Sequence, residues 1–260
     1  MSIDSIHSVT SPYTGINPTQ SALASGKQIN TAADNPAGLA MVNAMNSQVM
    51  AQSVSMRNAN DGMGLLQTAD GASQSFSVNM QRMYDLSLQA SNGTLNPAQR
   101  NHLNTEFQQG LKELDRIATT TQFNGMNLLN GELNAIQIAL GDSQSELSLP
   151  NLQPNALGLA NLDLNNPANA GLAMQALQTA GEFMGEVRAQ FGAQQNGLVS
   201  AFNNMANTQI NTIGSRSQIE DTDVAKAASE QSRDDVLNRA AIMMLSIGNQ
   251  ERTNTLQLLS

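Results

Sequence analysis

The chain has 260 residues and a net charge of −9, and it is 40 % hydrophobic but only 3 % aromatic. Its length allows one large domain or two small ones, and the scarcity of aromatic rings favours long helices packed through narrow seams over an enzyme core with a deep pocket. The acidic balance leaves no basic patch for nucleic acid and disfavours anionic lipid, so we expect no nucleic-acid partner and no membrane insertion.

Residues 1–35 are predicted to form a short helix followed by a linker. Their apolar residues step at helical intervals, but helix-breaking residues interrupt the run, and a proline inside a helix removes a backbone donor and clashes with the preceding turn. The apolar residues are Ile3, Ile6, Val9, Tyr13 and Ile16, and the interruptions are Pro12, Gly15 and Pro18.

Residues 36–131 are predicted to form the N-terminal half of a helical core domain, in which residues 36–117 are two long helices folded back on each other. In the first helix, apolar residues recur every seven positions in two interleaved rows, which is the a/d pattern of a coiled coil. One row is Val42, Val49, Met56 and Met63, and the other is Met45, Ala59, Leu66 and Met80. The pattern is imperfect, because Gln52 and Ser73 also fall on this seam.

The first of these helices is predicted to end at Asn92-Gly93 and the second to begin at Asn96-Pro97. Asn96 can cap the free N–H groups of a helix, and proline suits the first turn. The second helix has an apolar face at steps of three and four residues. Its members are Leu103, Phe107, Leu111, Leu114 and Ile117.

A small β-hairpin and an ordered loop are predicted for residues 132–168. Two Asn-Gly pairs, Asn124-Gly125 and Asn130-Gly131, first give a dense turn signal. Apolar residues then alternate on both sides of residues 141–143, as in paired strands. The alternating residues are Ile136, Ile138, Leu140, Leu147 and Leu149.

Helical periodicity returns in residues 169–217, which are predicted to complete the helical core. The seam consists of Ala173, Leu177, Ala180, Met184, Val187 and Phe191, extended less regularly by Leu198, Phe202, Met205 and Ile213. A last helix is predicted over residues 218–260, starting at Ile219, with Glu220, Asp221 and Asp223 as carboxylates suited to its N-terminus. The whole chain is therefore predicted to be mainly α, a long antiparallel helical bundle or coiled coil with a small β-hairpin excursion.

No group of residues in the sequence indicates catalysis. Cysteine is absent, which excludes disulfides and thiolate metal sites, and His7 and His102 are the only histidines. No metal-binding HExxH pattern, phosphate-binding glycine loop or Ser/His/Asp order is present. We therefore expect no enzyme activity, no cofactor and no metal.

Four motifs, in order along the chain, resemble segments of bacterial flagellin, the subunit of the flagellar filament. Residues 25–38 resemble the flagellin segment SSGLRINSAKDDAAG, and residues 57–62 match its RNANDG. Residues 122–125 match its TQFNG turn, and residues 217–223 resemble its SRIEDAD. The likeness covers residues 25–140 and 195–260, so we identify the chain as flagellin-like.

The resemblance implies a structural protein that is exported and self-assembles into a helical homopolymer for motility. Residues 1–35 and 218–260 would line an inner tube, and the core helices would form an outer tube. Residues 132–168 are too few for the projecting domains of large flagellins. Export would use the flagellar secretion apparatus and an export chaperone, which agrees with our expectation of no cleavable signal peptide and an extracellular location. Filament cap and junction proteins would be further partners.

Two segments would carry inter-subunit contacts if the resemblance holds. Residues 81–89 resemble the flagellin segment QRVRELAVQ, which packs between subunits and is read by the host innate immune receptor for flagellin. Residues 112–116 resemble its NEIDR. The expected interface residues are Gln81, Arg82, Leu86, Gln89, Glu113, Asp115 and Arg116. Tyr84 stands where the family has arginine, which argues against recognition by the receptor.

The last helix is the other expected functional surface. Its apolar surface is wider than one stripe, which indicates burial by something outside the monomer. By resemblance, an export chaperone would hold this helix before assembly, and the helix would then fold into the inner tube. The residues concerned are Val236, Leu237, Ala240, Met243, Met244, Ile247, Leu256 and Leu259.

Two alternatives stay open from the sequence. A flagellin-like cell-surface binding module would present the helical core without building filaments, and the prolines near the N-terminus favour it. A hook–filament junction protein or a minor subunit is suggested by residues 90–94, although the motifs at residues 122–125 and 217–223 argue against a junction protein.

Overall fold

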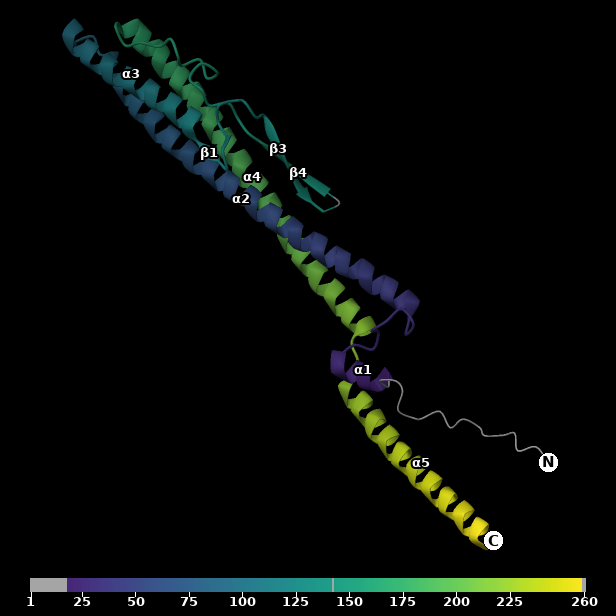
Figure 1. Ribbon diagram of the computed structural model, residues 1–260. Coiled ribbons are helices and arrows are strands. Elements are labelled where there is room, and N and C mark those ends of the chain that lie inside the picture. The colour runs from purple at the N-terminus through teal and green to yellow at the C-terminus, as the bar shows by residue number, and fades with distance from the viewer. Residues whose placement is uncertain (1–17, 142, 259–260) are drawn as a thin grey trace. The chain divides into compact units, whose positions relative to one another are not determined.

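The structure is a computed structural model that describes residues 18–141 and 143–258. The helices are α1 (Pro18–Ser25), α2 (Pro36–Ala90), α3 (Pro97–Thr120), α4 (Pro167–Glu220) and α5 (Val224–Leu258). The strands are β1 (Gln122–Phe123), β2 (Met126–Asn127), β3 (Ala135–Leu140) and β4 (Ser143–Ser148), as Figure 1 shows. The predicted mainly α fold with a small β-hairpin is confirmed. The chain divides into two compact units, one made of Met50–Gln209 and the other of the residues before and after it.

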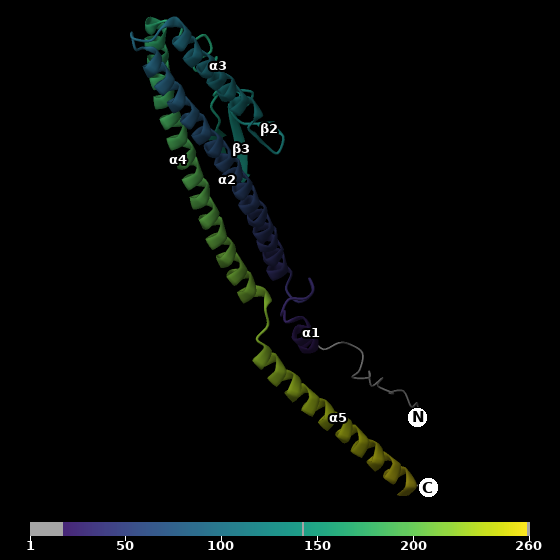
Figure 2. The ribbon, with the colours of Figure 1, turned by 90° about the vertical axis from the view of Figure 1, so that its left-hand side faces the viewer.

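In the unit Met50–Gln209, α2 and α4 lie side by side and run in opposite directions (Figures 1 and 2). Two contacts mark this pairing: Arg188 Nε donates to Asp70 Oδ1 at 2.9 Å, and Gln209 Nε2 donates to Ser53 Oγ at 2.7 Å. Buried residues on both helices alternate at steps of four and three, which is the spacing of a two-helix seam. The predicted row on α4 is confirmed at Ala173, Leu177, Ala180, Met184, Val187, Phe191 and Leu198, whereas Ile213 is exposed.

On α2, one predicted row is confirmed within this unit and the other is one residue out of place. The confirmed row is Ala59, Leu66, Ser73 and Met80. In the other row, Met56 and Met63 are only partly buried. The residues that complete the seam are instead Ser55, Gly62, Ala69, Phe76, Met83 and Ala90. A Cβ added at Gly62 would lie 3.1 Å from Leu198 Cδ1, so small residues on α2 allow α4 to approach closely.

The antiparallel hairpin of α2 and α3 is confirmed, and α3 begins with the predicted cap. Asn96 Oδ1 accepts a hydrogen bond from the Gln99 backbone N–H at 2.8 Å, and Gln99 Oε1 accepts one from the Asn96 N–H at 3.0 Å. This reciprocal pair is a capping box, and Pro97 occupies the first turn. The predicted apolar face lies inward, with Phe107, Leu111 and Leu114 buried and Leu103 and Ile117 partly buried.

Arg100, in the first turn of α3, closes the connection between the two helices. The residue is only 8 % exposed. Its Nε donates to the carbonyl of Ala90 at 3.1 Å, and its Nη2 donates to the carbonyls of Asn92 and Leu95 at 3.2 and 3.4 Å. The last carbonyls of a helix have no partner within it and carry partial negative charge. The guanidinium therefore satisfies the end of α2 and complements its charge.

Two antiparallel hairpins follow α3. The first joins β1 to β2 through Asn124 and Gly125, whose φ angles of +49° and +78° suit a two-residue primed turn. The sequence predicted this turn but not its strands. The predicted β-hairpin is confirmed in β3 and β4, where Ile136 pairs with Leu147 and Gly141 turns the chain at φ +79°.

The loop after β4 is ordered, as predicted. Leu152, Leu159 and Leu164 are fully buried in the core of the unit. Gln108 Nε2, from α3, donates to the carbonyl of Leu162 at 2.8 Å. The loop therefore covers α3 with both apolar side chains and backbone groups.

In the other unit, the segment after α1 pairs with the end of α4. The Gln28 backbone N–H donates to the carbonyl of Glu220 at 2.7 Å. Lys27 Nζ lies 2.5 Å from Glu220 Oε1, and Arg216 Nε lies 3.6 Å from Glu220 Oε2. Glu220 is 7 % exposed, so its carboxylate is a nearly buried charge held between two cations.

The predicted start of the last helix is wrong. Glu220 belongs to the end of α4, and α5 begins only after a short break. Asp223 caps α5, because its Oδ1 accepts hydrogen bonds from the N–H groups of Ala225 and Lys226 at 3.0 and 3.1 Å. The sequence suggested a helix start at Glu220 because a carboxylate favours a helix N-terminus. In the structure the carboxylate instead pairs with Lys27, near the other end of the chain.

The predicted order of a short helix and a linker agrees with α1 and the non-helical segment that leads to α2, although Pro18, predicted to interrupt the helix, is the first residue of α1. The remaining expectations for this region, on Ile3, Ile6, Val9, Pro12, Tyr13, Gly15 and Ile16, lie outside the described residues.

Replacement of Arg100 by methionine is expected to lower the unfolding free energy by about 1–3 kcal/mol, because the carbonyls at the end of α2 lose a charged donor. Urea unfolding followed by circular dichroism at 222 nm measures this. The control is Arg116→Met, since Arg116 makes only an exposed pair and should change stability by less than about 0.5 kcal/mol. Equal midpoints for the two variants would contradict the capping role.

Candidate assembly surfaces

The structure places five of the seven predicted inter-subunit residues around three separate grooves of the unit Met50–Gln209. Gln81 borders a groove between α2 and α4. Arg82 and Glu113 border a second, between α2 and α3, and Asp115 borders a third, between α3 and the loop after β4. The exposed members of the predicted set are Gln81, Arg82, Gln89, Asp115 and Arg116. The set therefore forms several faces rather than one patch.

The groove between α2 and α3 has a volume of about 210 Å³ and is edged by ion pairs within the chain. Arg82 Nε donates to Glu106 Oε1 at 2.8 Å, and its Nη2 contacts the same oxygen. Arg116 Nε and Nη2 donate to the two carboxylate oxygens of Glu113 at 2.8 and 2.5 Å. Exposed pairs of this kind contribute little to stability, so they remain able to exchange partners on association.

Leu86 does not lie on the surface as the other predicted residues do. It is 6 % exposed, belongs to the core of the unit and forms part of the floor of the α2–α3 groove. Its position in the heptad faces α3, so its packing is internal to the monomer.

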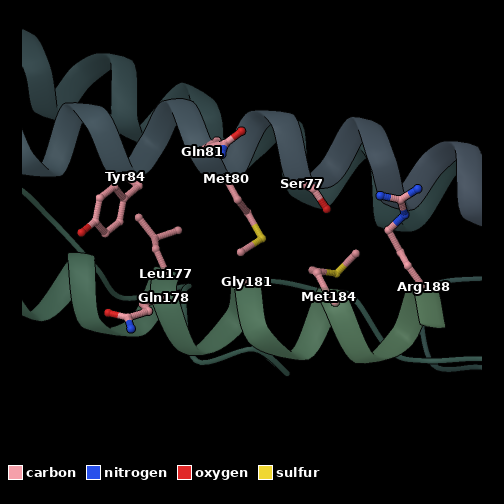
Figure 3. A pocket seen from close by; sticks show the side chains of 10 residues that line it. Ser77, Met80, Gln81, Tyr84, Leu177, Gln178, Gly181, Met184 and Arg188 are labelled. Atoms are coloured by element: carbon pink, nitrogen blue, oxygen red, sulfur yellow. The ribbon is translucent and has the colours of Figure 1, made fainter. Parts of the chain in front are cut away.

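The groove between α2 and α4 has a volume of about 430 Å³ and an apolar floor. Figure 3 shows Met80 of α2 and Leu177 and Met184 of α4 pointing into the space between the helices. Tyr84 stands at the rim and is 37 % exposed, and Gly181 leaves the α4 side open. This groove is a shallow surface channel with no titratable cluster suited to chemistry.

The predicted apolar surface of α5 is exposed. Val236, Leu237, Met243, Met244 and Ile247 are each more than half exposed, although all are large apolar residues. Ala240 is exposed with them. Leu256 lies within α5, and Leu259 lies outside the described residues. The described part of α5 thus carries more uncovered apolar surface than one isolated stripe.

Within the described ranges, no group of three or more His, Asp or Glu side chains is placed to hold a metal ion. In the same residues, no helix combines the length and the apolar character that crossing a bilayer requires.

Comparison with known proteins accounts for nearly the whole chain. Residues 2–134 match the family model of the bacterial flagellin N-terminal helical region, and residues 174–259 match that of the flagellin C-terminal helical region. A flagellin of Halalkalibacterium halodurans is 37 % identical over 242 residues, which cover 91 % of this chain and 89 % of that protein. The chain belongs to the bacterial flagellin family. A flagellin of Listeria monocytogenes is 34 % identical over 266 residues, covering 95 % of this chain and 92 % of that protein.

A solved flagellin structure agrees with this membership, and a more distant structure shares the fold. The crystal structure of Bacillus cereus flagellin matches with a TM-score of 0.53 and 35 % identity, covering 57 % of this chain and 88 % of that one. A putative flagellar hook-associated protein from Vibrio parahaemolyticus, at 13 % identity and a TM-score of 0.63, shares the fold over 72 % of this chain and 100 % of that one.

Family membership makes the chain a structural subunit of the flagellar filament. The binding-module and junction-protein alternatives raised from the sequence are not favoured, because the flagellin matches cover both the N-terminal and the C-terminal helical regions.

The hydrogen bond from Arg116 holds the pKa of Glu113 below its ordinary value. Because the folded pKa is the lower one, the pairing is complete above the ordinary glutamate range and is lost as the pH falls through the lowered pKa. Carboxyl ¹³C NMR titration of the monomer is expected to show this depression. In Arg116→Gln the pKa of Glu113 should rise, and an unchanged titration there would contradict the pairing.

Proposed function

We propose that the chain is exported and polymerises outside the cell through the exposed faces of the unit Met50–Gln209 and through α5. The observation that carries the proposal is the exposure of large apolar residues on α5, such as Leu237 and Met244. Removing apolar surface from water contributes about 25 cal/mol per Å². A helix that leaves such residues in water as a monomer is therefore stabilised by association, and further copies of the chain are the partners that family membership supplies.

Residues 1–35 and 218–260 are proposed to form the inner wall of the polymer, with the residues between them outside. Before export, a cytoplasmic chaperone would cover α5 as a helix held in a groove. The apolar residues of α5 are flanked by Asn, Gln and Ser, which suits a segment that orders on binding and can be delivered to the secretion apparatus.

Gln81, Arg82, Gln89, Glu113 and Arg116 are proposed to contact neighbouring copies, and Asp115 joins them on the other side of α3. The role is structural and without catalysis. Filament cap and junction proteins are proposed as partners at the ends of the polymer. The host innate immune receptor is not proposed, because Tyr84 replaces the arginine of the segment that the receptor reads.

Seeded assembly viewed by negative-stain electron microscopy tests the proposal. The full chain is expected to form thin filaments, whereas a chain lacking residues 237–260 should stay monomeric and keep the helical circular-dichroism signal of the unit Met50–Gln209. Filaments from the shortened chain would contradict the role of α5. A full chain that stays monomeric with seeds present would contradict polymerisation itself.

Arg82→Glu is expected to leave the chain as a soluble monomer, because it places a carboxylate beside Glu106 and removes a cation from an exposed face. Sedimentation after seeding measures the polymer fraction. Filaments in normal yield would contradict the proposed contact of Arg82 with a neighbouring copy. The matched control combines Arg82→Glu with Glu106→Arg, which restores the pair within the chain. We expect this double variant to stay monomeric; recovery of assembly would mean that only the pair within the chain matters.

A further inference from the structure

Glycines inside the helices of the unit Met50–Gln209 fall into two kinds. At Gly62 an added Cβ would lie 3.1 Å from Leu198 Cδ1, and at Gly110 it would lie 2.8 Å from Met83 Cγ. Close packing within the monomer therefore explains these two glycines, because any larger residue would push on a buried neighbour.

Gly181 and Gly185 of α4 are of the other kind. They lie one helical turn apart, and a Cβ added at either position would meet nothing within 4 Å. Glycine destabilises a helix interior relative to alanine. Nothing in the monomer makes glycine necessary at these positions, and the same holds for Gly197. What distinguishes Gly181 and Gly185 is that they line a groove, where a contact outside the monomer would use the open backbone.

Both glycines line the groove between α2 and α4. In Figure 3 the groove floor is formed by Met80, Leu177 and Met184, with Gly181 between them on α4. The groove therefore combines apolar side chains with an α4 backbone that no side chain covers at this point. Such a surface fits another helix, whose own residues would pack against the bare turn.

Arg188 also lines the groove and is paired with Asp70. The acidic side chains beside the groove indicate which helix packs there. Glu182 and Glu186, each adjacent in sequence to one of the glycines, are exposed and four residues apart. On α3, Lys112 and Arg116 are also exposed and four residues apart, on the side of that helix opposite its buried row. Arg116 is paired with Glu113 in the monomer, and an exposed pair of this kind can exchange partners on association. Four residues of α-helix span about 6 Å, so the two acidic and the two basic side chains have matching spacing.

We propose that α3 of a second copy packs over Gly181 and Gly185, with its Lys112 and Arg116 beside Glu182 and Glu186. The groove lies between α2 and α4, whereas Lys112 and Arg116 lie on α3. The contact therefore joins two different surfaces of neighbouring copies and can repeat from copy to copy. The inference rests on the proposed polymerisation and names the faces through which two neighbouring copies meet.

The glycines give a test in which monomer stability and assembly change in opposite directions. The double variant Gly181→Ala, Gly185→Ala should unfold at higher urea concentration than the original chain, because alanine favours the helix and its Cβ meets open space. The same variant should need at least about tenfold more protein to assemble, since the methyl groups hold the incoming helix away. Normal assembly by this variant would overturn the proposal.

Gly197→Ala is the matched control. Gly197 also lies in α4 with nothing within 4 Å of an added Cβ, but it does not line the groove. This variant should gain stability and assemble as the original chain does. If it assembles as poorly as the double variant, the loss comes from stiffening α4 and the proposal fails.

Charge exchange identifies the partner. One variant carries Lys112→Glu and Arg116→Glu, and the other carries Glu182→Lys and Glu186→Lys. Each alone should need at least about tenfold more protein to assemble, because like charges then face each other, and an equimolar mixture should assemble near the original concentration. If both variants and the original chain assemble normally, this inference is wrong but the proposed polymerisation is not contradicted. If the original chain never assembles, the proposed function itself is wrong.

Discussion

The close pairing of α2 with α4 is the constraint on which the unit Met50–Gln209 depends. Small residues on α2 allow the two helices to approach closely, and larger residues such as Phe76 and Phe191 are buried in the same core. Other elements then attach to this pair: Asn58 Nδ2 of α2 donates to the carbonyl of Ala139 in β3 at 3.0 Å. The seam even buries the Ser73 hydroxyl, which has no hydrogen-bond partner among the described residues. A buried hydroxyl without a partner lowers the stability of the fold by about 1–3 kcal/mol. The small size of Ser73, which lets the two helices approach closely, outweighs this cost.

The fold was predictable where local signals and the final packing agree. The capping box at Asn96 and the apolar face of α3 depend on residues within a few positions of one another, and both are as predicted. The second row of α2 was misplaced because the seam there uses residues such as Ser55 and Gly62, which a pattern of large apolar residues does not include. Glu220 was misassigned because its partner Lys27 lies 193 residues away in sequence, beyond the reach of any local rule.

The sequence predicted which residues belong to the candidate surfaces, but not how these residues are divided among the faces of the molecule. Resemblance placed Gln81, Arg82 and Asp115 together in one set, whereas the structure assigns them to three grooves. Heptad position explains the separation, since neighbouring residues on one helix point about 100° apart and so border different partner helices. The same geometry turns Leu86 inward. The open space above Gly181 could not be predicted from the sequence, because the sequence does not distinguish a closely packed glycine from one that faces solvent.

α5 presents the opposite case to α2 and α4. In those helices the large apolar residues are mostly buried on the sides that face a neighbouring helix, although a few, such as Val78 and Leu172, are exposed. In α5, Val236, Met243 and Ile247 share one stripe, while Leu237 and Ile242 lie well away from it, and all five are exposed. A helix with apolar residues on several sides is characteristic of a position surrounded by protein. One covering helix would leave part of this surface in water, so complete burial of α5 requires contacts on more than one side. Several copies packed around α5, as proposed for the polymer, would meet that requirement.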